Sequence, residues 1–192
     1  SMLELDYIKY SRFCHIYYLF LDQLFKEDFV KSHIKCNFYS WLFLHILLKY
    51  RTDRDSLGPV KIPADVYYGP FTGRAIKQYN VTGNPSHQNL IKSFVMIKRS
   101  AAVANIKTKA INKKQGTAIV KACDKILSGK YIDQFVIDMI NSGAGTAFNM
   151  NSNEVITNVA LKGLGKKQGQ YEFLHPNDHV NMSQSSNDTY PT

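Results

Sequence analysis

The sequence predicts a mainly α-helical domain that carries one small β hairpin. Apolar residues recur at spacings of three and four, the period of an amphipathic helix, in three segments: residues 88–105, 116–127 and 146–164. Residues 51–73 are instead rich in turn signals, with Gly58-Pro59 and Pro63 on either side of the short extended stretch 60–62. Three helices and one strand–turn element are therefore expected.

The apolar stripes define one buried side for each predicted helix. The first stripe consists of Leu90, Ile91, Phe94, Val95, Ala101 and Ala102. The second consists of Ala118, Ile119, Ala122, Cys123, Ile126 and Leu127, and the third of Val155, Ile156, Val159 and Ala160. Gly129 and Gly165 follow the second and third stripes, and a glycine at this position commonly ends a helix.

Prolines shape the remaining parts of the chain. Pro63 disfavours the helical conformation for Ile62, so residues 51–73 are expected to form a small hairpin and not a full sheet. The tail, residues 175–192, is polar and contains Pro176. A loop is predicted there.

Composition and charge restrict the class of protein. The chain has 192 residues, of which 44% are hydrophobic and 20% charged, as in folded proteins that bury a core. The formal net charge is +9, but the basic residues are scattered and form no stripe interleaved with aromatic residues after residue 50. We interpret them as solvated helix faces and predict no nucleic-acid partner.

The cysteines give no sign of a disulfide framework. Cys14, Cys36 and Cys123 include no CxxC pair and are odd in number, which also argues against a structural zinc site. A cytoplasmic, reducing location fits this pattern best. Cys123 lies in an apolar helical pattern, so a packing role is predicted for it.

The first 50 residues differ in composition from the rest. They are dense in Tyr, Phe, Leu and Ile, whereas Gly, Pro, Asn and Ala become common afterwards. Their longest apolar runs, residues 15–21 and 41–48, are too short to span a membrane, so no membrane partner is predicted. We expect two parts: an aromatic-rich helical segment, residues 1–50, without an assigned role, and a second part, residues 51–192.

Small residues lead directly into the third predicted helix, with the sequence Ser-Gly-Ala-Gly-Thr from Ser142 to Thr146. The first backbone N–H groups of a helix are unpaired and carry partial positive charge, and glycines let an anion approach them closely. Thr146 adds a hydroxyl donor. The same pattern is also typical of a structural glycine-rich turn, so taken alone it is a weak signal for anion binding.

The segment from His175 to Asp188 contains many short hydroxyl and amide side chains. Ser185, Ser186 and Asn187 can donate together to a carboxylate, an acceptor with two oxygens. The alternative is a loop in which these side chains satisfy their own backbone.

Two histidines of this segment have the spacing of a metal-binding pair. His175 and His179 flank Asp178, but a site would need a helix and a third ligand, and Pro176 argues against one regular helix. No phosphate-binding loop or dinucleotide fingerprint is present either. We therefore predict neither a metal nor a cofactor.

In this order, the two motifs resemble the first two signature regions of the fumarase/aspartase superfamily. Residues 51–58 and 62–69 resemble the amino-terminal region of these enzymes. The resemblance covers residues 51–192 almost continuously. It implies the N-terminal helical domain of these lyases with its small β hairpin, truncated before their long helical bundle.

Two members of the superfamily compete. Residues 143–147 depart from the Gly-Ser-Gly-Thr-Gln of fumarases, and Tyr67-Tyr68-Gly69 departs from their Tyr-Trp-Gly. Ser186 and Thr189 favour fumarase instead, because aspartases more often have Ser-Thr-Asn-Asp-Ala. The resemblance is closest to aspartate ammonia-lyase (aspartase), which reversibly eliminates ammonia from L-aspartate to give fumarate. Class II fumarate hydratase is the alternative.

The resemblance implies roles for residues of both motifs. The substrate-binding residues would be Thr146, Ser185, Ser186 and Asn187. A secondary carboxylate site described in fumarases would comprise His175, Asn177 and Asp178. Arg74 would contact a substrate carboxylate, although Pro70-Phe71 replaces the Val-His common before it in aspartases. Clustered donors suit this reaction because its intermediate carries extra negative charge on a carboxylate.

The resemblance also implies a homotetramer in which three subunits contribute to each active site. The catalytic base of the family is a serine on a mobile loop that lies downstream of Thr192, so no catalytic residue is expected in this chain and the chain by itself is expected to be inactive. A third hypothesis stays open. The chain would then be a non-catalytic interaction protein, or a pseudogene product, in which residues 1–50 cover surface left bare by the missing bundle.

Overall fold

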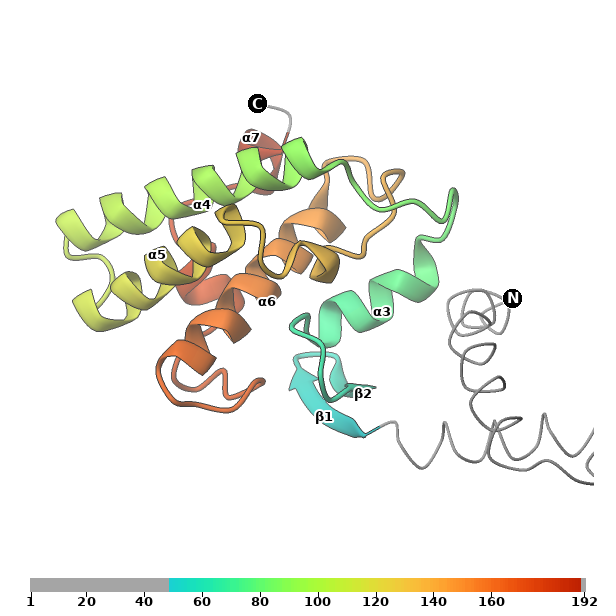
Figure 1. The fold of residues 1–192 in the computed structure, drawn as a ribbon, viewed down its shortest axis with the longest axis horizontal. Helices are drawn as coiled ribbons and strands as arrows, with labels where there is room; N and C mark the ends of the chain where they lie inside the picture. The colour runs from blue at the N-terminus through green and yellow to red at the C-terminus, as the bar shows by residue number, and fades with distance from the viewer. Residues whose placement is uncertain (1–48, 191–192) are drawn as a thin grey trace, which may run out of the picture. The chain divides into compact units, whose positions relative to one another are not determined.

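One central helix organises residues 49–190, the part of the chain that the computed structural model describes (Figure 1). In chain order the elements are β1 (Tyr50–Asp55), β2 (Gly58–Pro63), α3 (Pro70–Gln78), α4 (Gln88–Lys107), α5 (Lys113–Leu127), the 3-10 turn η1 (Ile132–Gln134), α6 (Thr146–Gly163), the π-helical turn η2 (Pro176–Val180) and α7 (Ser186–Thr189). Predictions for residues 1–48 lie outside the described residues. From 49 to 190, every helix is too short or too polar to cross a membrane.

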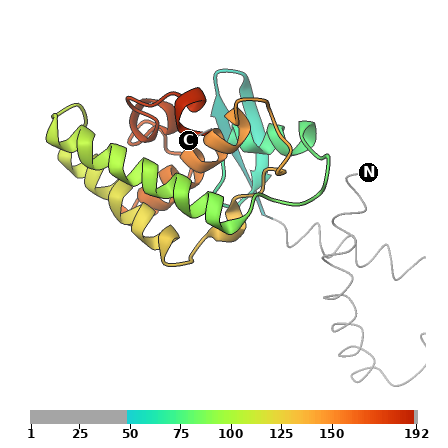
Figure 2. The same ribbon diagram turned by 90° about the horizontal axis from the view of Figure 1, so that it is seen from above.

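Helices α4 and α5 lie side by side, and α6 packs against α5 (Figures 1 and 2). Helices α4 and α5 each begin with a side-chain cap. His87 Nδ1 accepts a hydrogen bond from the Asn89 N–H at the start of α4, and Asn112 Oδ1 accepts one from the Lys114 N–H at the start of α5. Cys123 is fully buried and unpaired, as its packing role requires. The three predicted helices are confirmed, with boundaries shifted by a few residues.

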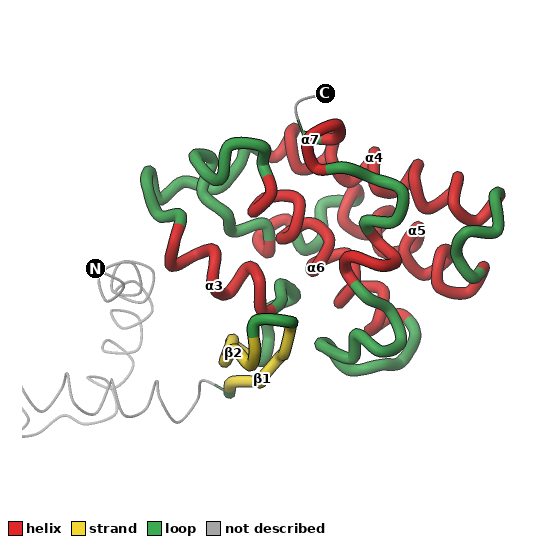
Figure 3. Tube along the Cα trace, turned by 180° about the vertical axis from the view of Figure 1, so that it is seen from behind, coloured by secondary structure: helices red, strands yellow, loops and turns green. Residues whose placement is uncertain are grey.

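The predicted hairpin is also confirmed. Strands β1 and β2 pair antiparallel with Arg51 opposite Ile62, and they lie next to α3 at one edge of the described unit (Figure 3). Helix α3 was not predicted, because its first residues fall in the turn-rich segment. Pro70 occupies its first position, where a missing N–H costs nothing.

Helix α6 is buried on every side, which corrects the expectation that it buries one side only. Residues 147–161 are in contact with surrounding elements, apart from the half-buried Met150. Its polar side chains hold those surroundings in place. Asn151 accepts from the Val136 N–H and donates to the Gln134 carbonyl. The buried Asn151 amide is therefore paired on both its oxygen and its nitrogen.

The Glu154 carboxylate of α6 caps helix α3, although it lies 85 residues beyond Gly69 in the chain. It accepts hydrogen bonds from the N–H groups of Gly69 (2.9 Å), Phe71 (2.9 Å) and Thr72 (3.0 Å), and α3 has no side-chain cap of its own. Burial raises the pKa of Glu154, and these three N–H donors oppose that rise. A Cβ atom at Gly69 would lie 2.7 Å from the carboxylate, so glycine is required there.

The polar tail is more ordered than predicted. Where a loop was expected, η2 and the short helix α7 form. His175 caps η2 through its imidazole, and Ser185 caps α7 through its hydroxyl. Both tight turns depend on side-chain caps, which periodicity alone does not reveal.

Candidate functional site

The two motifs meet at the N-terminus of α6. Gly145 adopts φ +68° immediately before the helix, a conformation that favours glycine. Ser142 Oγ accepts from the Ala147 N–H at 3.0 Å and closes the turn. Thr146, the first residue of α6, is exposed, and its hydroxyl has no partner within residues 49–190. The turn therefore presents a free donor at the positive end of a helix.

Helix α7 is held against this turn by Tyr190. The ring lies where a Cβ atom of Gly145 would be, and it contacts the rings of Phe148 (5.8 Å between centroids) and Phe94 (6.3 Å). Gly145 is therefore needed twice, for its backbone conformation and for the space that Tyr190 fills. This packing brings the second motif to the first.

A hydrogen bond joins the motifs directly. Asn149, one turn into α6 from Thr146, donates from Nδ2 to Ser186 Oγ at 2.6 Å. Ser185 Oγ accepts from the Asn187 N–H at 3.3 Å. Neither serine hydroxyl donates a hydrogen bond within the described residues, so both protons remain available to an external acceptor.

Behind Ser186 lies a buried polar hub. Asn181 Oδ1 accepts from Lys98 Nζ (2.7 Å), Asn149 Nδ2 (3.2 Å) and Asn153 Nδ2 (3.3 Å). These residues come from α4, α6 and the turn after η2. The hub therefore ties the tail segment to α6, which follows the first motif, and to α4.

Asp138 fixes the loop that leads to the first motif. Burial favours its neutral form, but hydrogen bonds from the N–H groups of Ile140, Thr82 and Gly83 and from the Thr82 hydroxyl lower its pKa to about 2. The same carboxylate joins this loop to the one that precedes α4. Asp138 thereby joins the loop before α4 to the loop before α6 by hydrogen bonds.

The implied secondary site is gathered on η2. His175 Nδ1 accepts from the N–H groups of Asn177 and Asp178, both at 3.3 Å, and Asp178 Oδ2 lies 3.3 Å from the same nitrogen. The two N–H groups require Nδ1 to be unprotonated, so an ion pair with Asp178 would form only at their expense. The side chains of Asn177 and Asp178 are exposed.

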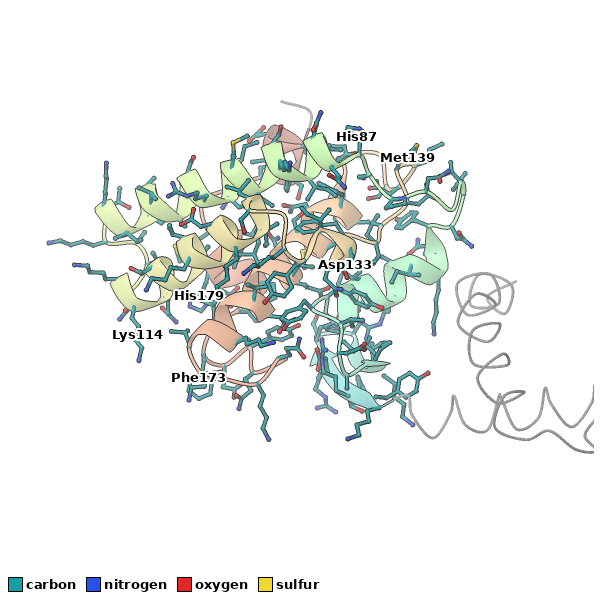
Figure 4. All side chains as sticks on the ribbon, viewed as in Figure 1. His87, Lys114, Asp133, Met139, Phe173 and His179 are labelled. Carbon is teal, nitrogen blue, oxygen red and sulfur yellow. The ribbon has the colours of Figure 1, made fainter. Side chains whose placement is uncertain are left out.

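His179 serves the turn itself. Its Nδ1 accepts from the His175 N–H at 2.8 Å, and burial lowers the pKa of His179. Figure 4 shows it beside α5, where its Nε2 lies 3.4 Å from Gln115 Nε2. Within the described residues, no three His, Cys, Asp or Glu side chains are grouped so that they could hold a metal ion.

Arg74 belongs to the hairpin and not to this cluster. Its guanidinium pairs with Asp55 and donates to the Gly58 carbonyl at 3.0 Å. Figure 1 shows the hairpin and α7 at opposite edges of the view. The structure thus brings Thr146 together with residues 185–187 and leaves Arg74 apart.

Sequence reasoning assigned no role to three residues of the site. Asn149 follows Thr146 by three positions, a spacing that places both on one helix face. Lys98 interrupts the apolar stripe of α4, which is the signal of a buried cation. Asn181 stands in a run of polar residues and gives no comparable signal.

Two open grooves lie elsewhere on the surface. One, of about 640 Å³, runs along α4 and is lined by Ser93, Met96, Ile97, Ser100, Ala101 and Ala104. The other, of about 620 Å³, lies between α5 and the end of α6, and four lysines line it: Lys113, Lys114, Lys121 and Lys125. Neither groove is lined by a predicted site residue.

Comparison with known proteins places the chain. The family described as Lyase matches residues 58–192. Aspartate ammonia-lyase of Bacillus subtilis is 50% identical over 144 residues, which are 75% of this chain and 30% of that protein. The chain therefore spans about 30% of the length of this curated relative.

Solved structures agree with this placement. A crystal structure of fumarate lyase:delta crystallin from Brucella melitensis has a TM-score of 0.73 and 45% identity over 74% of this chain and 34% of that one. Class II fumarase from Schistosoma mansoni has a TM-score of 0.70 and 38% identity over 75% and 30%. The matched range, the identity and the fold agree: the chain belongs to the fumarase/aspartase superfamily of lyases.

Proposed function

We propose that this chain is part of an aspartate ammonia-lyase, an enzyme that reversibly eliminates ammonia from L-aspartate to give fumarate. The observation that carries the proposal is the junction of the two motifs, made by the Asn149–Ser186 hydrogen bond and the Gly145–Tyr190 contact. It gathers hydroxyl donors at the N-terminus of a buried helix. Such a cluster suits a substrate carboxylate that gains negative charge in the reaction.

Within this site, Thr146, Ser185, Ser186 and Asn187 bind the substrate carboxylate. Support comes from their geometry, since the hydroxyls of Thr146, Ser185 and Ser186 donate to no group within residues 49–190. The helix dipole of α6 adds positive potential at the same place. His175, Asn177 and Asp178 form a secondary carboxylate site through the exposed face of η2. Arg74, which pairs with Asp55 in the hairpin, is a further proposed substrate contact that rests on the family resemblance alone.

Fumarate hydratase is the second candidate. Ser186 and Thr189 favour it, and so does the likeness to the class II fumarase from Schistosoma mansoni. Aspartase is preferred because of residues 143–147 and Tyr67-Tyr68-Gly69 and because the aspartase of Bacillus subtilis is 50% identical. Both candidates share the carboxylate site and differ in the leaving group.

Assembly as a homotetramer completes the proposal. The groove along α4 supports it, because Met96 is 50% exposed there and small residues such as Ser100 and Ala104 allow close approach of another helix. The catalytic base comes from a part of the protein beyond Thr192. This chain by itself is therefore expected to bind and not to turn over.

The test compares two substrates and two proteins. L-Aspartate or L-malate is added to the 192-residue chain and to the longest protein expressed from its gene, and fumarate is followed by ultraviolet absorbance, with ammonia assayed in parallel. Fumarate and ammonia from L-aspartate with the longer protein support aspartase. If L-malate gives fumarate and L-aspartate does not, the result supports fumarase. No product from either substrate overturns the enzyme proposal in favour of an interaction protein, and turnover by the 192-residue chain overturns the expectation that it is inactive.

A further inference from the structure

The Ser186 hydroxyl is held at the junction of the two motifs by one buried amide. Asn149, which is 1% exposed, donates from Nδ2 to Ser186 Oγ at 2.6 Å. Serine and threonine hydroxyls in helices commonly donate to the carbonyl four residues earlier, as Thr189 of α7 does to Ser185 at 2.8 Å. Ser186 makes no such bond within residues 49–190, so in this part of the chain its hydroxyl only accepts.

The direction of this bond follows from Asn181. Its Nδ2 donates to the Gln184 carbonyl at 3.2 Å, and its Oδ1 accepts from Lys98 Nζ at 2.7 Å. A carbonyl can only accept and an ammonium can only donate, so the Asn181 amide is fixed at both ends. Its Oδ1 therefore faces Asn149, which meets it with Nδ2 at 3.2 Å.

The Asn149 amide has only one orientation that suits this partner. If it were reversed, its Oδ1 would face Asn181 Oδ1, and two acceptors would meet with no proton between them. In the observed orientation, one Nδ2 hydrogen goes to Asn181 and the other goes to Ser186 Oγ. Because Ser186 Oγ accepts this bond, its own proton is left for another acceptor.

Packing gives no reason for an amide at position 149. Asn149 Oδ1 is buried and has no hydrogen-bond partner within the described residues, and an unpaired buried acceptor costs free energy. A leucine there would fill a similar volume without this oxygen, and Asn181 Oδ1 would keep two donors, Lys98 and Asn153. The feature that the amide supplies is a donor aimed at Ser186.

We propose that Asn149 is a positioning residue for the carboxylate site: oriented by Asn181, it donates to Ser186 Oγ and so leaves the Ser186 proton to the bound dicarboxylate. This inference rests on the proposed carboxylate site. It concerns binding geometry and adds no chemical step.

Asn153 is a matched control for Asn149. Both residues lie on α6, both are buried, both donate to Asn181 Oδ1, and both leave their own Oδ1 unpaired within the described residues. They differ in their second partner, because Asn149 reaches Ser186 whereas Asn153 reaches Met150 Sδ at 3.7 Å. At either position, leucine removes the amide and aspartate replaces it with a group that accepts when ionised.

The probe is succinate, a dicarboxylate without a leaving group. It is titrated by calorimetry into the 192-residue chain, and thermal unfolding of the same samples shows which variants are folded. Asn149→Asp requires the Ser186 hydroxyl to donate inward, so we expect this variant to bind succinate about tenfold more weakly than the unsubstituted chain. Asn153→Asp places the same charge beside the same Asn181 oxygen and should bind within about threefold.

A double-mutant cycle shows whether Asn149 acts through Ser186. Asn149→Leu should weaken succinate binding about fivefold when Ser186 is present, and less than about twofold in a Ser186→Ala chain, because no hydroxyl is left there to position. Asn153→Leu should have the same small effect in both chains.

Each result has a distinct meaning. Equal succinate binding by Asn149→Asp and Asn153→Asp overturns the claim that Asn149 directs the Ser186 proton. If the aspartate variants do not fold, the leucine cycle decides: an effect of Asn149→Leu that is the same with and without the Ser186 hydroxyl overturns the positioning role. An unsubstituted chain that binds no succinate overturns the proposed carboxylate site itself.

Discussion

Two buried charges lie beside the same central helix and differ in how they are paired. Glu154 is 2% exposed and accepts three backbone N–H groups at the start of α3. Lys98 is 0% exposed and makes one hydrogen bond, at the junction of the two motifs. The fully paired charge builds the fold, whereas the poorly paired one lies behind the candidate site. Since both charges are buried, their pairing, and not their burial, is what distinguishes the charge that builds the fold from the one beside the candidate site.

The same contrast separates the two ends of the polar face of α6. Toward its C-terminal end, Asn158 donates to the Tyr67 carbonyl at 2.8 Å and accepts from the Gly169 N–H at 2.9 Å, so its amide is used on both sides. Toward its N-terminal end, Asn149 and Asn153 each leave an oxygen unpaired. The Asn158 amide therefore holds two loops, whereas the Asn149 amide holds α7 through Ser186 and leaves its oxygen unpaired.

Removing Glu154 should have the largest effect on stability. Glu154→Leu leaves three buried N–H groups without an acceptor, and we expect a loss of about 4 kcal/mol in the free energy of unfolding. Urea unfolding followed by circular dichroism measures it. Glu172→Gln, on an exposed side chain, is the control and should change stability by less than about 0.5 kcal/mol. A loss below about 1 kcal/mol for Glu154→Leu would contradict its role as the cap of α3.

A methyl group at Gly145 should have the next largest effect. Gly145→Ala meets both a left-handed backbone and the Tyr190 ring, so we expect a loss of about 2–3 kcal/mol and displacement of α7. Gly143→Ala is the matched control, because a Cβ atom there has nothing within 4 Å and the backbone is not left-handed. If both alanines cost the same in urea unfolding, Tyr190 does not seat the second motif on the first.

The smallest effect concerns Lys98 and pH. Burial lowers its pKa to about 7 in the folded chain, whereas an unfolded lysine titrates near 10.4. The unfolded state therefore binds more protons above pH 7, so this group makes stability rise with pH. From pH 7 to 8.5, urea midpoints should rise more for the unsubstituted chain than for Lys98→Met. Parallel midpoints would show that the Lys98 ammonium is not desolvated.

The sequence predicted the helices that bury a continuous apolar stripe, because period alone identifies them. Helix α3 was not predicted from the sequence, because its cap, Glu154, lies 85 residues beyond Gly69 in the chain. The turn η2 was missed for another reason: its cap, His175, is its neighbour in the chain, but periodicity does not detect a cap. Local signals cannot reveal partners that only tertiary structure brings together.

For the site, sequence supplied the donors and the structure supplied their arrangement. Thr146 and residues 185–187 were recognisable as motif members, but the contact between Gly145 and Tyr190 was not. Arg74, implied as a substrate contact, pairs with Asp55 in this structure, and its contact with substrate stays a prediction. In a sequence, an arginine that binds an anionic ligand cannot be distinguished from one that pairs with a carboxylate of the same chain. The partner is known only once the packing is known.

The measurement that tests the central claim most directly is a succinate titration of the 15N-labelled chain followed by NMR. The account predicts that the largest amide shifts occur at Thr146 and at residues 185–187, together with the side-chain amide of Asn149. Shifts confined to the lysine-lined groove between α5 and α6, or no shifts at millimolar succinate, would contradict it. Either of those results would leave the junction of the two motifs as a packing feature without a ligand.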